Sequence, residues 1–318
     1  MFQKLGNQPK GELKMSEKKF DVAVIGNVGI DTNIYPELDE INFNVEANFT
    51  ANVDYIGQAG GYGARGFAQL DYRSAFIGCV GEDYHGEFIK KTFRADGINI
   101  DGIFIDPAGT SRSVNFMFPD GRRKNFYDGK SHMNIGPDLE VCKQIMANTK
   151  VLHFNIPNWA RTLLPIAKEL GIVVSTDLQD IVHLEDSYRE DFIKYSDVIF
   201  FSSVNFENPG IVMESINKKH PNKIIISGMG KKGCAIFINN DVRYFDSIEF
   251  GDPVIDTNGA GDGLAVGFLS QYFLEGRSIE QSIMSAQIVA RYTCSKKAST
   301  KNLITQKILN DVLNKIPF

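Results

Sequence analysis

The sequence predicts an α/β fold, in which a mostly parallel β-sheet is covered by helices on both faces and carries a small antiparallel sheet. Short apolar runs alternate with helical patterns through most of the 318 residues. Alternation of strand and helix at this spacing is typical of parallel strands joined by helical crossovers. Two stretches with strict period-two alternation interrupt the series, and they indicate strands with one solvent-facing side.

The strand–helix series begins with an expected strand at residues 21–25. Each expected strand is a short apolar run, and each expected helix has apolar residues at helical spacing. Further strands are expected at residues 74–80, 98–105, 151–155, 172–176, 198–201, 223–227 and 234–238, and helices at 63–70, 87–95, 162–170 and after 261. The series therefore predicts one large sheet between two layers of helices.

The first period-two stretch runs from residue 41 to residue 55, with apolar residues at every odd position. The second comprises residues 114–118 and 124–127 around Asp120-Gly121, and an Asp-Gly pair between extended runs is a hairpin signal. We interpret both stretches as one small antiparallel sheet that projects from the main body. Its apolar face would cover a ligand or a second copy of the chain. Two ordinary surface hairpins are the alternative interpretation.

Composition and charge exclude several classes of protein. The chain has 34 Lys and Arg and 39 Asp and Glu, so no basic excess is available to neutralise a nucleic-acid backbone. The four cysteines lie far apart without a C-x-x-C pair, which predicts neither a zinc site nor a disulfide framework and is typical of a cytoplasmic protein. No apolar stretch is long enough to span a bilayer. Polar residues 1–19 lack the apolar region of a signal peptide, and we expect a disordered leader there.

The strongest candidate for chemistry is the segment DTNGAGD at residues 256–262. It follows an apolar run at 253–255 that we expect to be extended, and it precedes a helical pattern that starts at residue 263. A strand, a glycine-rich turn and a helix start point several backbone N–H groups at one spot, where the helix dipole adds positive potential. Gly259 and Gly261 let an anion approach the backbone closely. A helix with an Asp N-cap after a glycine turn is the purely structural alternative.

Asp262 places a carboxylate beside this anion site. Two negative groups repel each other, so the carboxylate is useful there only if it acts on a further group, such as a hydroxyl. Phosphoryl transfer meets that condition. The amides of Gly259, Ala260 and Gly261 would hold the transferring phosphoryl group, and Asp262 would accept the proton of the attacking hydroxyl. The segment therefore predicts a kinase that uses Asp262 as its general base.

The same segment resembles the C-terminal signature of the PfkB family of carbohydrate kinases, in the ribokinase-like superfamily, which reads roughly D-T-x-G-A-G-D. The N-terminal signature resembles residues 60–64 (GGYGA) at a helix start and residues 75–88, with the pattern of strand, G-x-V-G-x-D-x-x-G and helix. The resemblance implies a ribokinase-like three-layer sandwich over residues 20–318. It also implies an inserted β-lid near residues 33–57 and 110–130.

The resemblance further implies roles for single residues. Asp31, which follows the first strand, would bind sugar hydroxyls, and Gly60 and Gly61 would let the substrate approach the helix start. Asn155 stands where ribokinases often carry an acidic sugar contact. The ATP contacts would fall on Ser202, Ser227, Gly228, Gly230, Gly233 and Asn258.

ATP and Mg²⁺ are the implied cofactors, with a monovalent cation as an option, and the lid forms a dimer clasp in many members. The implied partners are therefore a small sugar or nucleoside and a second copy of the chain. Many members place magnesium with an N-x-x-E motif, for which this chain offers Asn205 with Glu207 nearby. Arg65 replaces the Asn of the N-terminal signature, and its charged fork suits either an anionic substrate or a surface ion pair.

The sequence leaves three classes of acceptor substrate open. The acceptor would be a neutral sugar, an anionic sugar that Arg65 recognises, or a nucleoside such as adenosine, inosine or cytidine. Arg122 and Arg123, just after the expected hairpin turn, would reach the substrate from the lid or be solvated. A base would stack on aromatic residues of the second lid segment, namely Phe116, Phe118, Phe126 and Tyr127. A protein of another class, a catalytically silent sugar or nucleotide sensor, would be free to lose Asp262.

Overall fold

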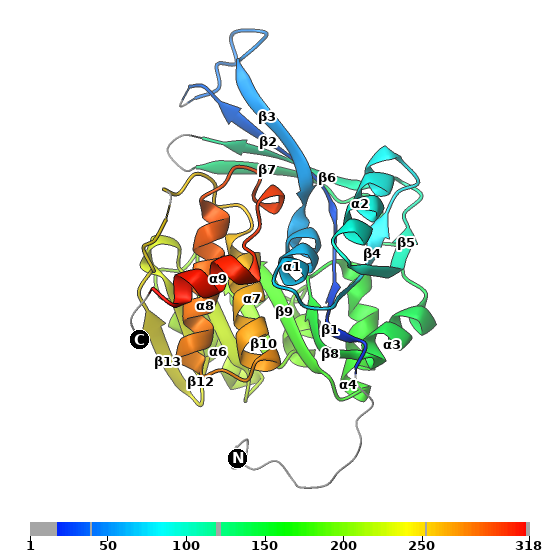
Figure 1. Ribbon diagram of the computed structural model, residues 1–318, viewed down its shortest axis with the longest axis vertical. Coiled ribbons are helices and arrows are strands. Elements are labelled where there is room, and N and C mark those ends of the chain that lie inside the picture. The colour runs from blue at the N-terminus through cyan, green and yellow to red at the C-terminus, as the bar shows by residue number, and fades with distance from the viewer. Residues whose placement is uncertain (1–17, 39, 119–121, 252, 316–318) are drawn as a thin grey trace, which may run out of the picture.

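The computed structural model describes residues 18–38, 40–118, 122–251 and 253–315, so most of the expected leader and the Asp120-Gly121 turn lie outside the described residues. Its centre is a nine-stranded sheet in the order β13-β12-β11-β10-β9-β8-β1-β4-β5 (Figure 1). Strands β11 to β5 in this order run parallel, while β12 and β13 each run antiparallel to the preceding strand. The strands are β1 (Phe20–Ile25), β4 (Ser74–Val80), β5 (Asn99–Ile105), β8 (Thr149–Phe154), β9 (Val173–Asp180), β10 (Val198–Ser202), β11 (Ile224–Gly228), β12 (Cys234–Ile238) and β13 (Asp241–Phe245).

Helices cover both faces of this sheet, which confirms the expected three-layer sandwich. Side chains alternate along β1, so that Val22 and Val24 face one apolar core while Ala23 and Ile25 face the other. The first core is closed by α1 (Gln58–Gln69), α2 (Tyr84–Ala95), α7 (Ala260–Leu269), α8 (Ile279–Cys294) and α9 (Gln306–Leu313), and the second by α3 (Leu139–Ala147), α4 (Leu164–Glu169), α5 (Glu190–Tyr195) and α6 (Pro209–Lys219). None of the helices in the described ranges is long and apolar enough to cross a membrane.

A second sheet, which we call the lid sheet, projects from the main body (Figure 1). Its order is β3-β2-β6-β7, with β2 (Gly29–Pro36), β3 (Thr50–Gly57), β6 (Ser111–Met117) and β7 (Arg123–Asp128). The lid sheet is mixed rather than purely antiparallel, because β2 and β6 pair in parallel. The physical reason is connectivity: β2 follows β1 and β6 follows β5, and both parent strands run in the same direction.

The strand expected from residue 41 is wrong in its first part. Residues 41–49, all of which are described, form no strand, and β3 begins only at Thr50. Asparagine side chains offer the backbone another set of partners here: the Asn48 side-chain amide donates to the Asn42 carbonyl (3.1 Å) and its oxygen accepts from the Asn42 N–H (3.0 Å). Such local bonds compete with a strand ladder. The apolar residues of the segment therefore stay in solvent, and Phe49 is 82% exposed.

Candidate active site

The expected site residues gather at the carboxyl edge of the main sheet, which is where open α/β sheets bind their ligands. Asn155 directly follows β8, Ser202 ends β10 and Gly228 ends β11. The lid sheet rises from the same edge, because its strands β2 and β6 continue from the ends of β1 and β5 (Figure 1). The expected reaction site therefore lies where the lid sheet meets this edge.

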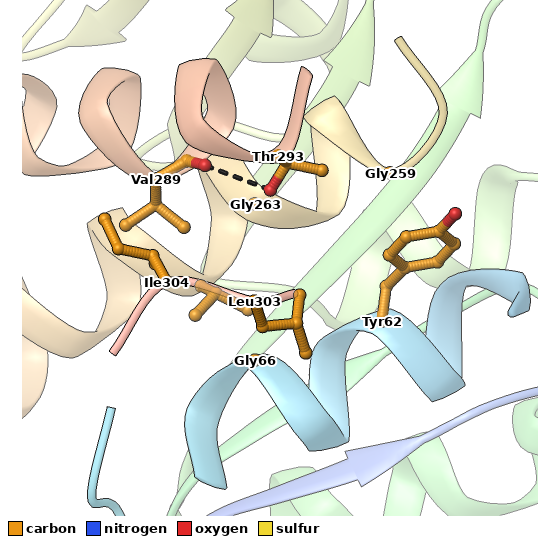
Figure 2. Close-up of a pocket in the computed structure, with 9 residues that line it drawn as sticks. Tyr62, Gly66, Gly259, Gly263, Val289, Thr293, Leu303 and Ile304 are labelled. Atoms are coloured by element: carbon orange, nitrogen blue, oxygen red, sulfur yellow. Dashed lines mark hydrogen bonds between the residues drawn. The ribbon is translucent and has the colours of Figure 1, made fainter. Parts of the chain in front are cut away.

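Residues 256–261, which we call the anion turn, lead into α7. Gly259 directly precedes the helix with a left-handed backbone conformation, φ +79°. A Cβ at Gly259 would lie 2.2 Å from a ring carbon of Tyr62, and Figure 2 shows Tyr62 on α1 beside this turn. By contrast, a Cβ at Gly261 would meet no atom of the described chain within 4 Å. The turn is thus closely packed on one side and open in front of Gly261, as an anion site requires.

The variant Gly259→Ala tests this packing. Both the positive φ and the Tyr62 ring oppose an added methyl group, so we expect a loss of about 2–4 kcal/mol in the free energy of unfolding. Gly261→Ala is the matched control, and it should change stability by no more than about 1 kcal/mol because the site is open. Denaturant unfolding of both variants measures this difference. Equal stabilities for the two variants would contradict the described turn.

Asp262 lies in the first turn of α7, half-buried. Its Oδ1 is shielded from solvent and has no hydrogen-bond partner in the described chain. Burial raises the pKa of Asp262 well above its usual value, and the nearby charges of Asp177 and Asp31 raise that pKa further. A carboxylate with a raised pKa and a free oxygen is suited to accept a proton.

Asp177, which the sequence reading missed, belongs to the same group of carboxylates. It lies near the carboxyl end of β9 and is buried, and its Oδ1 accepts a hydrogen bond from the Gln179 N–H (2.8 Å). Burial raises the pKa of Asp177 to about 6, with Arg189 opposing that rise and Asp180 adding to it. A signal was present in the sequence, since a polar residue directly after a buried parallel strand lies at the ligand-binding edge.

Asp31 lies on β2, at the base of the lid, and is only 4% exposed. Its Oδ2 accepts a long hydrogen bond from the Gln58 N–H at the start of α1 (3.4 Å), and its Oδ1 has no partner among the described residues. Burial raises the pKa of Asp31 to about 6. A buried carboxylate oxygen without a donor is matched by a ligand hydroxyl, because an unpaired buried polar atom is costly.

The diglycine at Gly60 and Gly61 is explained by packing within the protein. A Cβ at Gly60 would lie 2.4 Å from the Asn27 carbonyl oxygen, which accepts the Gly60 N–H at 2.9 Å. A Cβ at Gly61 would press on Ile56 and Val28 at 3.3 Å. Both glycines are buried, so they let α1 start close to the chain that leaves β1.

Arg65 forms an ion pair, which is one of its two expected roles. Its Nε donates to Asp96 Oδ2 (2.6 Å) and its Nη1 donates to the Thr300 carbonyl (2.7 Å). Both side chains of the pair are 14% exposed. The guanidinium is therefore bonded within the protein itself and is not held open for an anionic substrate.

The variant Arg65→Met separates the two roles. It leaves the Asp96 carboxylate without its partner in a largely buried place, so we expect stability to fall by about 2–4 kcal/mol. The KM for the acceptor should stay within about twofold, because Arg65 is occupied elsewhere. Steady-state kinetics at a temperature where the variant is folded provide the measurement, and a KM increase of tenfold or more would restore the substrate role.

Asn155 is the expected sugar contact on β8's side of the site. It is 2% exposed, and neither its amide nitrogen nor its side-chain oxygen has a hydrogen-bond partner within the described ranges. Its side chain occupies the space that a Cβ at Gly26 would need, with Oδ1 only 2.0 Å from that position. Its main chain is fixed by a hydrogen bond from the Asn155 N–H to the Ile25 carbonyl (2.8 Å). Asn155 therefore keeps a donor and an acceptor available for a ligand.

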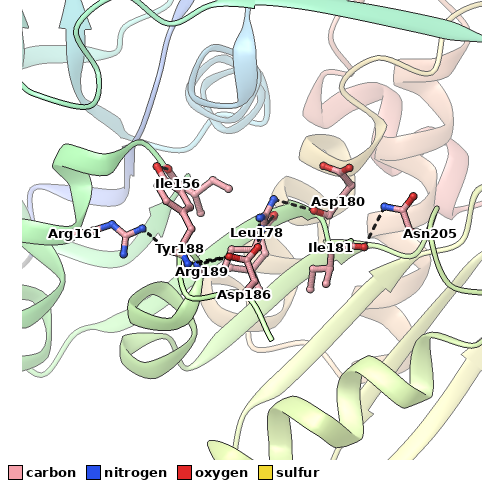
Figure 3. Close-up of polar contacts among 9 residues, drawn as sticks. All are labelled: Ile156, Arg161, Leu178, Asp180, Ile181, Asp186, Tyr188, Arg189 and Asn205. Atoms are coloured by element: carbon pink, nitrogen blue, oxygen red, sulfur yellow. Dashed lines mark hydrogen bonds and ion pairs between the residues drawn. The ribbon is translucent and has the colours of Figure 1, made fainter. Parts of the chain in front are cut away.

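Of the two expected metal residues, Asn205 is bonded to the backbone and Glu207 lies in solvent. The Asn205 amide nitrogen donates to the Ile181 carbonyl (3.1 Å), as Figure 3 shows, and Glu207 is exposed. The part of the chain that the structure describes holds no group of three His, Cys, Asp or Glu side chains able to bind a metal ion. Asn205 instead helps to hold the loop that follows β9.

The loop after β9 is fixed by two arginines (Figure 3). Arg189 donates to the carbonyls of Leu178 (2.8 Å) and Asp180 (2.9 Å) and pairs with Asp186. Arg161 lies over the Tyr188 ring at 4.3 Å, and the Tyr188 hydroxyl donates to the carbonyl that follows Asn155 (2.7 Å). The Arg189 contacts fix the backbone that directly follows Asp177.

The expected ATP contacts lie beside the start of α7. Ser202 pairs with Gly228 across β10 and β11, and Ser227 is fully buried. A Cβ at Gly228 would lie 3.8 Å from Leu264 of α7, so the turn after β11 is next to the anion turn. The two glycines of this turn that have positive φ are Gly230 (+58°) and Gly233 (+90°). Asn258, also expected here, is instead bonded to the lid.

The buried face of the lid is polar, which corrects the expectation of an apolar one. Asp31 and Asn33 of β2 lie opposite Ser113 and Asn115 of β6, and all four side chains are buried. The hydrophobic pattern of β3 and β7 gave no sign of this face, because these polar residues come from β2 and β6. A row of amide, hydroxyl and carboxyl groups is suited to a ligand with many hydroxyls.

The aromatic residues of the lid do not form one stacking surface. Phe116 and Phe126 contact each other edge to face, with ring centres 5.9 Å apart, at positions that alternate with the buried polar ones. Phe118 lies next to Arg122, whose guanidinium is 5.2 Å from the ring centre. Tyr127 alone of the four shares the face of Asp31, and its hydroxyl accepts a hydrogen bond from the Asn27 amide (2.6 Å).

Curated relatives of the chain are sugar kinases. An acarbose 7(IV)-phosphotransferase from Actinoplanes sp. is 28% identical over 298 residues, covering 91% of this chain and 97% of that protein. A 5-dehydro-2-deoxygluconokinase from Listeria innocua is 26% identical over 320 residues, covering 92% of this chain and 95% of that protein.

Solved structures share the fold over nearly the whole chain. The microbiome-derived acarbose kinase Mak1 has a TM-score of 0.85 at 26% identity, covering 93% of this chain and 99% of that one. The Arabidopsis thaliana ribokinase complexed with ribose and ATP has a TM-score of 0.77 at 20% identity, covering 92% and 98%, which is a likeness of fold.

The family assignment rests on the length of the match and on the residues already described. Residues 19–306 match the family described as pfkB family carbohydrate kinase. That range includes the whole main sheet, the lid sheet and the anion turn with Asp262. This chain therefore belongs to the pfkB family of carbohydrate kinases, phosphotransferases of the ribokinase-like fold that act on an alcohol group.

Proposed function

We propose that the chain transfers the γ-phosphate of ATP to a hydroxyl of a neutral carbohydrate, with Asp262 as the general base. One observation carries the proposal: Asp262, in the first turn of α7, has a shielded carboxyl oxygen without a partner in the described chain and lies near the buried carboxyl groups of Asp31 and Asp177, whose charges raise its pKa. A base and a sugar-binding carboxylate at one phosphate-binding turn meet the needs of phosphoryl transfer to an alcohol.

In the proposed reaction, Asp31 and Asn155 bind sugar hydroxyls and orient one of them toward Asp262. The acceptor oxygen attacks the γ-phosphorus while its proton passes to Asp262, and the bond from that phosphorus to the bridging oxygen of ADP breaks. The amides of residues 259–261 stabilise the charge on the transferring group. The lid excludes water, so that the γ-phosphate is not lost to hydrolysis.

Magnesium fits the site as a companion of the nucleotide rather than as a protein-bound ion. Mg²⁺ keeps several waters and is bound through substrate phosphates with one or two carboxylates. That requirement agrees with the lack of a three-residue metal group in the described ranges and with one buried carboxylate, Asp177, near the base. When bound, the ion neutralises phosphate charge. We assign no step to Asn205, Glu207 or a monovalent cation.

A neutral polyhydroxy acceptor is supported by the lid and by Arg65. The buried lid face is polar, and the Arg65 guanidinium is bonded to Asp96 and Thr300. Acarbose, which names two of the relatives, is such a polyhydroxy compound. Nucleosides are less well supported, because Phe116 and Phe126 occupy positions on the other face of the lid from Asp31.

A panel of acceptors tests the proposal. ATP consumption would be measured with acarbose, maltotriose, fructose, ribose, 5-dehydro-2-deoxygluconate and adenosine. We expect kcat/KM for at least one neutral sugar to exceed that for the sugar acid and for adenosine by tenfold or more. A preference for the sugar acid or for adenosine would overturn the choice of acceptor, and no sugar-dependent turnover at all would overturn the proposal.

We further propose that two copies associate through their lids. Several lid aromatic side chains are exposed, including Phe43 (89%), Phe49 (82%) and Phe126 (56%). Burying large apolar side chains of this kind favours association. We expect light scattering to report a dimer that the double variant Phe43→Ser/Phe49→Ser converts to a monomer. A wild-type protein that is still monomeric at about 100 μM, a concentration at which even a weak dimer forms, would contradict the proposal.

A further inference from the structure

The lid and the anion turn are joined by a buried carboxylate, Asp256. Asp256 is 1% exposed, and its Oδ2 accepts hydrogen bonds from the Asn33 amide (2.8 Å) and the Tyr35 hydroxyl (2.8 Å) of β2. Its Oδ1 accepts the backbone N–H of Asn258 (2.8 Å). One carboxylate therefore holds two lid side chains with one oxygen and the turn itself with the other.

Asn258 makes a second connection between the same two parts. Its side-chain amide donates to the Tyr55 hydroxyl of β3 (2.8 Å), and its side-chain oxygen accepts from Arg123 of β7 (3.1 Å). The Tyr55 hydroxyl in turn donates to the side-chain oxygen of Asn33 (3.1 Å) and accepts from the Tyr62 hydroxyl (3.0 Å). In this way β2 is bonded to Asp256, and β3 and β7 are bonded to Asn258.

The anion turn has few other contacts that fix its shape. It belongs to no strand, and Thr257 and Gly261 are exposed. On the side of the main body, the N–H groups of residues 255 and 256 donate to the carbonyl that ends α8 (2.8 and 3.1 Å), and Tyr62 packs against Gly259 (Figure 2). The Asp256 Oδ2 and the side-chain amide of Asn258 are bonded to the lid, as described above. The direction of the amides at 259–261 therefore depends on where the lid lies.

We propose that Asn33, Tyr35 and Tyr55 are positioning residues, which assemble the anion turn by holding Asp256 and Asn258. They touch no reacting atom in the proposed reaction. Because Asp31, the sugar contact, is on the same strand and face as Asn33 and Tyr35, sugar binding and turn geometry share one element. Loss of these lid contacts should then slow phosphoryl transfer without weakening the binding of the sugar. This inference rests on the proposed role of Asp262.

The variant Tyr35→Phe removes the hydroxyl that donates to Asp256 and keeps the ring. The lost bond is to a charged group, and such bonds are the strong ones. We expect kcat for the best neutral sugar of the panel to fall about 10–100-fold. The KM values for that sugar and for ATP should stay within about threefold, because Tyr35 is neither a proposed sugar contact nor part of the turn after β11 that is expected to bind ATP.

Thr32→Val is the matched control on the same strand. The Thr32 hydroxyl donates to Asp54 Oδ1 (2.6 Å), at a position that alternates with Asn33. The Thr32→Val variant therefore also loses a hydrogen bond within the lid, but none to the anion turn. We expect its kcat to stay within twofold of wild type. If Tyr35→Phe does not fold, Tyr55→Phe, which loses the bonds to Asn33 and Asn258, serves the same test.

A double-mutant cycle adds a readout that a general loss of stability would not move. If Tyr35 acts through Asp256, then Tyr35→Phe should slow the Asp256→Asn enzyme by less than twofold. Asp262→Ala in the same assay distinguishes a failure of the positioning role from a failure of the proposed function. Suppose that Asp262→Ala is inactive. If Tyr35→Phe then keeps a normal kcat, or loses no more kcat than Thr32→Val does, the inference about the positioning residues is overturned and the proposed function stands. An active Asp262→Ala would overturn the proposed function.

Discussion

Replacing Asp262 by asparagine is expected to lower kcat by about 10²–10⁴-fold, the usual contribution of a positioned general base. The amide keeps the shape of the carboxylate but takes no proton from the attacking hydroxyl. ATP binding should survive, because the expected nucleotide contacts lie on the turn after β11 and not on Asp262. Single-turnover kinetics and nucleotide titration measure the two effects separately.

Loss of folding does not account for this result, for an electrostatic reason. Asp262 is held near Asp177 and Asp31, whose charges raise its pKa, so removing its charge relieves repulsion. The Asp262→Asn protein should be at least as stable as wild type. Asp54→Asn, which removes a carboxylate from the outer side of the lid, is the matched control and should keep its kcat. Wild-type turnover by Asp262→Asn would show that another group is the base.

The variant Asp177→Asn is expected to stabilise the protein and to slow it. Burial raises the pKa of Asp177 to about 6 from an ordinary value of 3.8. Between about pH 4 and pH 6 the folded state therefore holds a proton that the unfolded state has lost, and stability falls as the pH rises through this window. The asparagine variant lacks this fall, and we expect a gain of about 1–3 kcal/mol at pH 7.5.

The same variant should change the pH dependence of catalysis. The Asp177 charge raises the pKa of Asp262, so its removal makes Asp262 ionise at lower pH and makes it a weaker base. The acid limb of the kcat/KM profile should move to lower pH, and kcat at pH 8 should fall about tenfold or more. Thermal unfolding and a pH–rate profile measure the two effects. An unmoved acid limb together with lower stability would contradict the described group of carboxylates.

The main sheet was predictable from the sequence because its strands are buried on both faces. A run such as residues 74–80 carries no charged residue and is apolar after Ser74, so it can be recognised without knowledge of its neighbours, and the observed β4 has those bounds. The anion turn was predictable for a related reason. Gly259 is required locally by its positive φ, and the residues that follow it form the first turn of a helix.

The lid was harder to predict because its buried face is polar. β2 carries Asp31, Asn33 and Tyr35 toward the interior, so no hydrophobic alternation marks it as a strand. The segment from residue 41 had the alternation but not the partners, and its asparagines bond one another instead. Alternation of apolar and polar residues with a period of two predicts a strand only where another strand is available to pair with it.

The roles of several polar and charged residues depended on partners far along the chain. Arg65 suited either a ligand or an ion pair until its contact with Asp96 was known. Asn258, expected at the nucleotide, bonds Tyr55 of the lid. Asp177 was overlooked, because its importance comes from its position next to Asp262 and not from a local motif. Such pairings follow from the tertiary fold, which local spacing does not encode.

The central claim is that the Asp262 carboxylate accepts the proton of the acceptor hydroxyl. A crystal structure of the complex with the best neutral sugar of the panel and a non-hydrolysable ATP analogue tests it directly. We predict an Asp262 oxygen about 2.6–3.2 Å from the hydroxyl that faces the γ-phosphate, the reach of a working base. If that hydroxyl instead contacts Asp31 or Asp177, with Asp262 more than about 5 Å away and beyond hydrogen-bond reach, the assignment is contradicted.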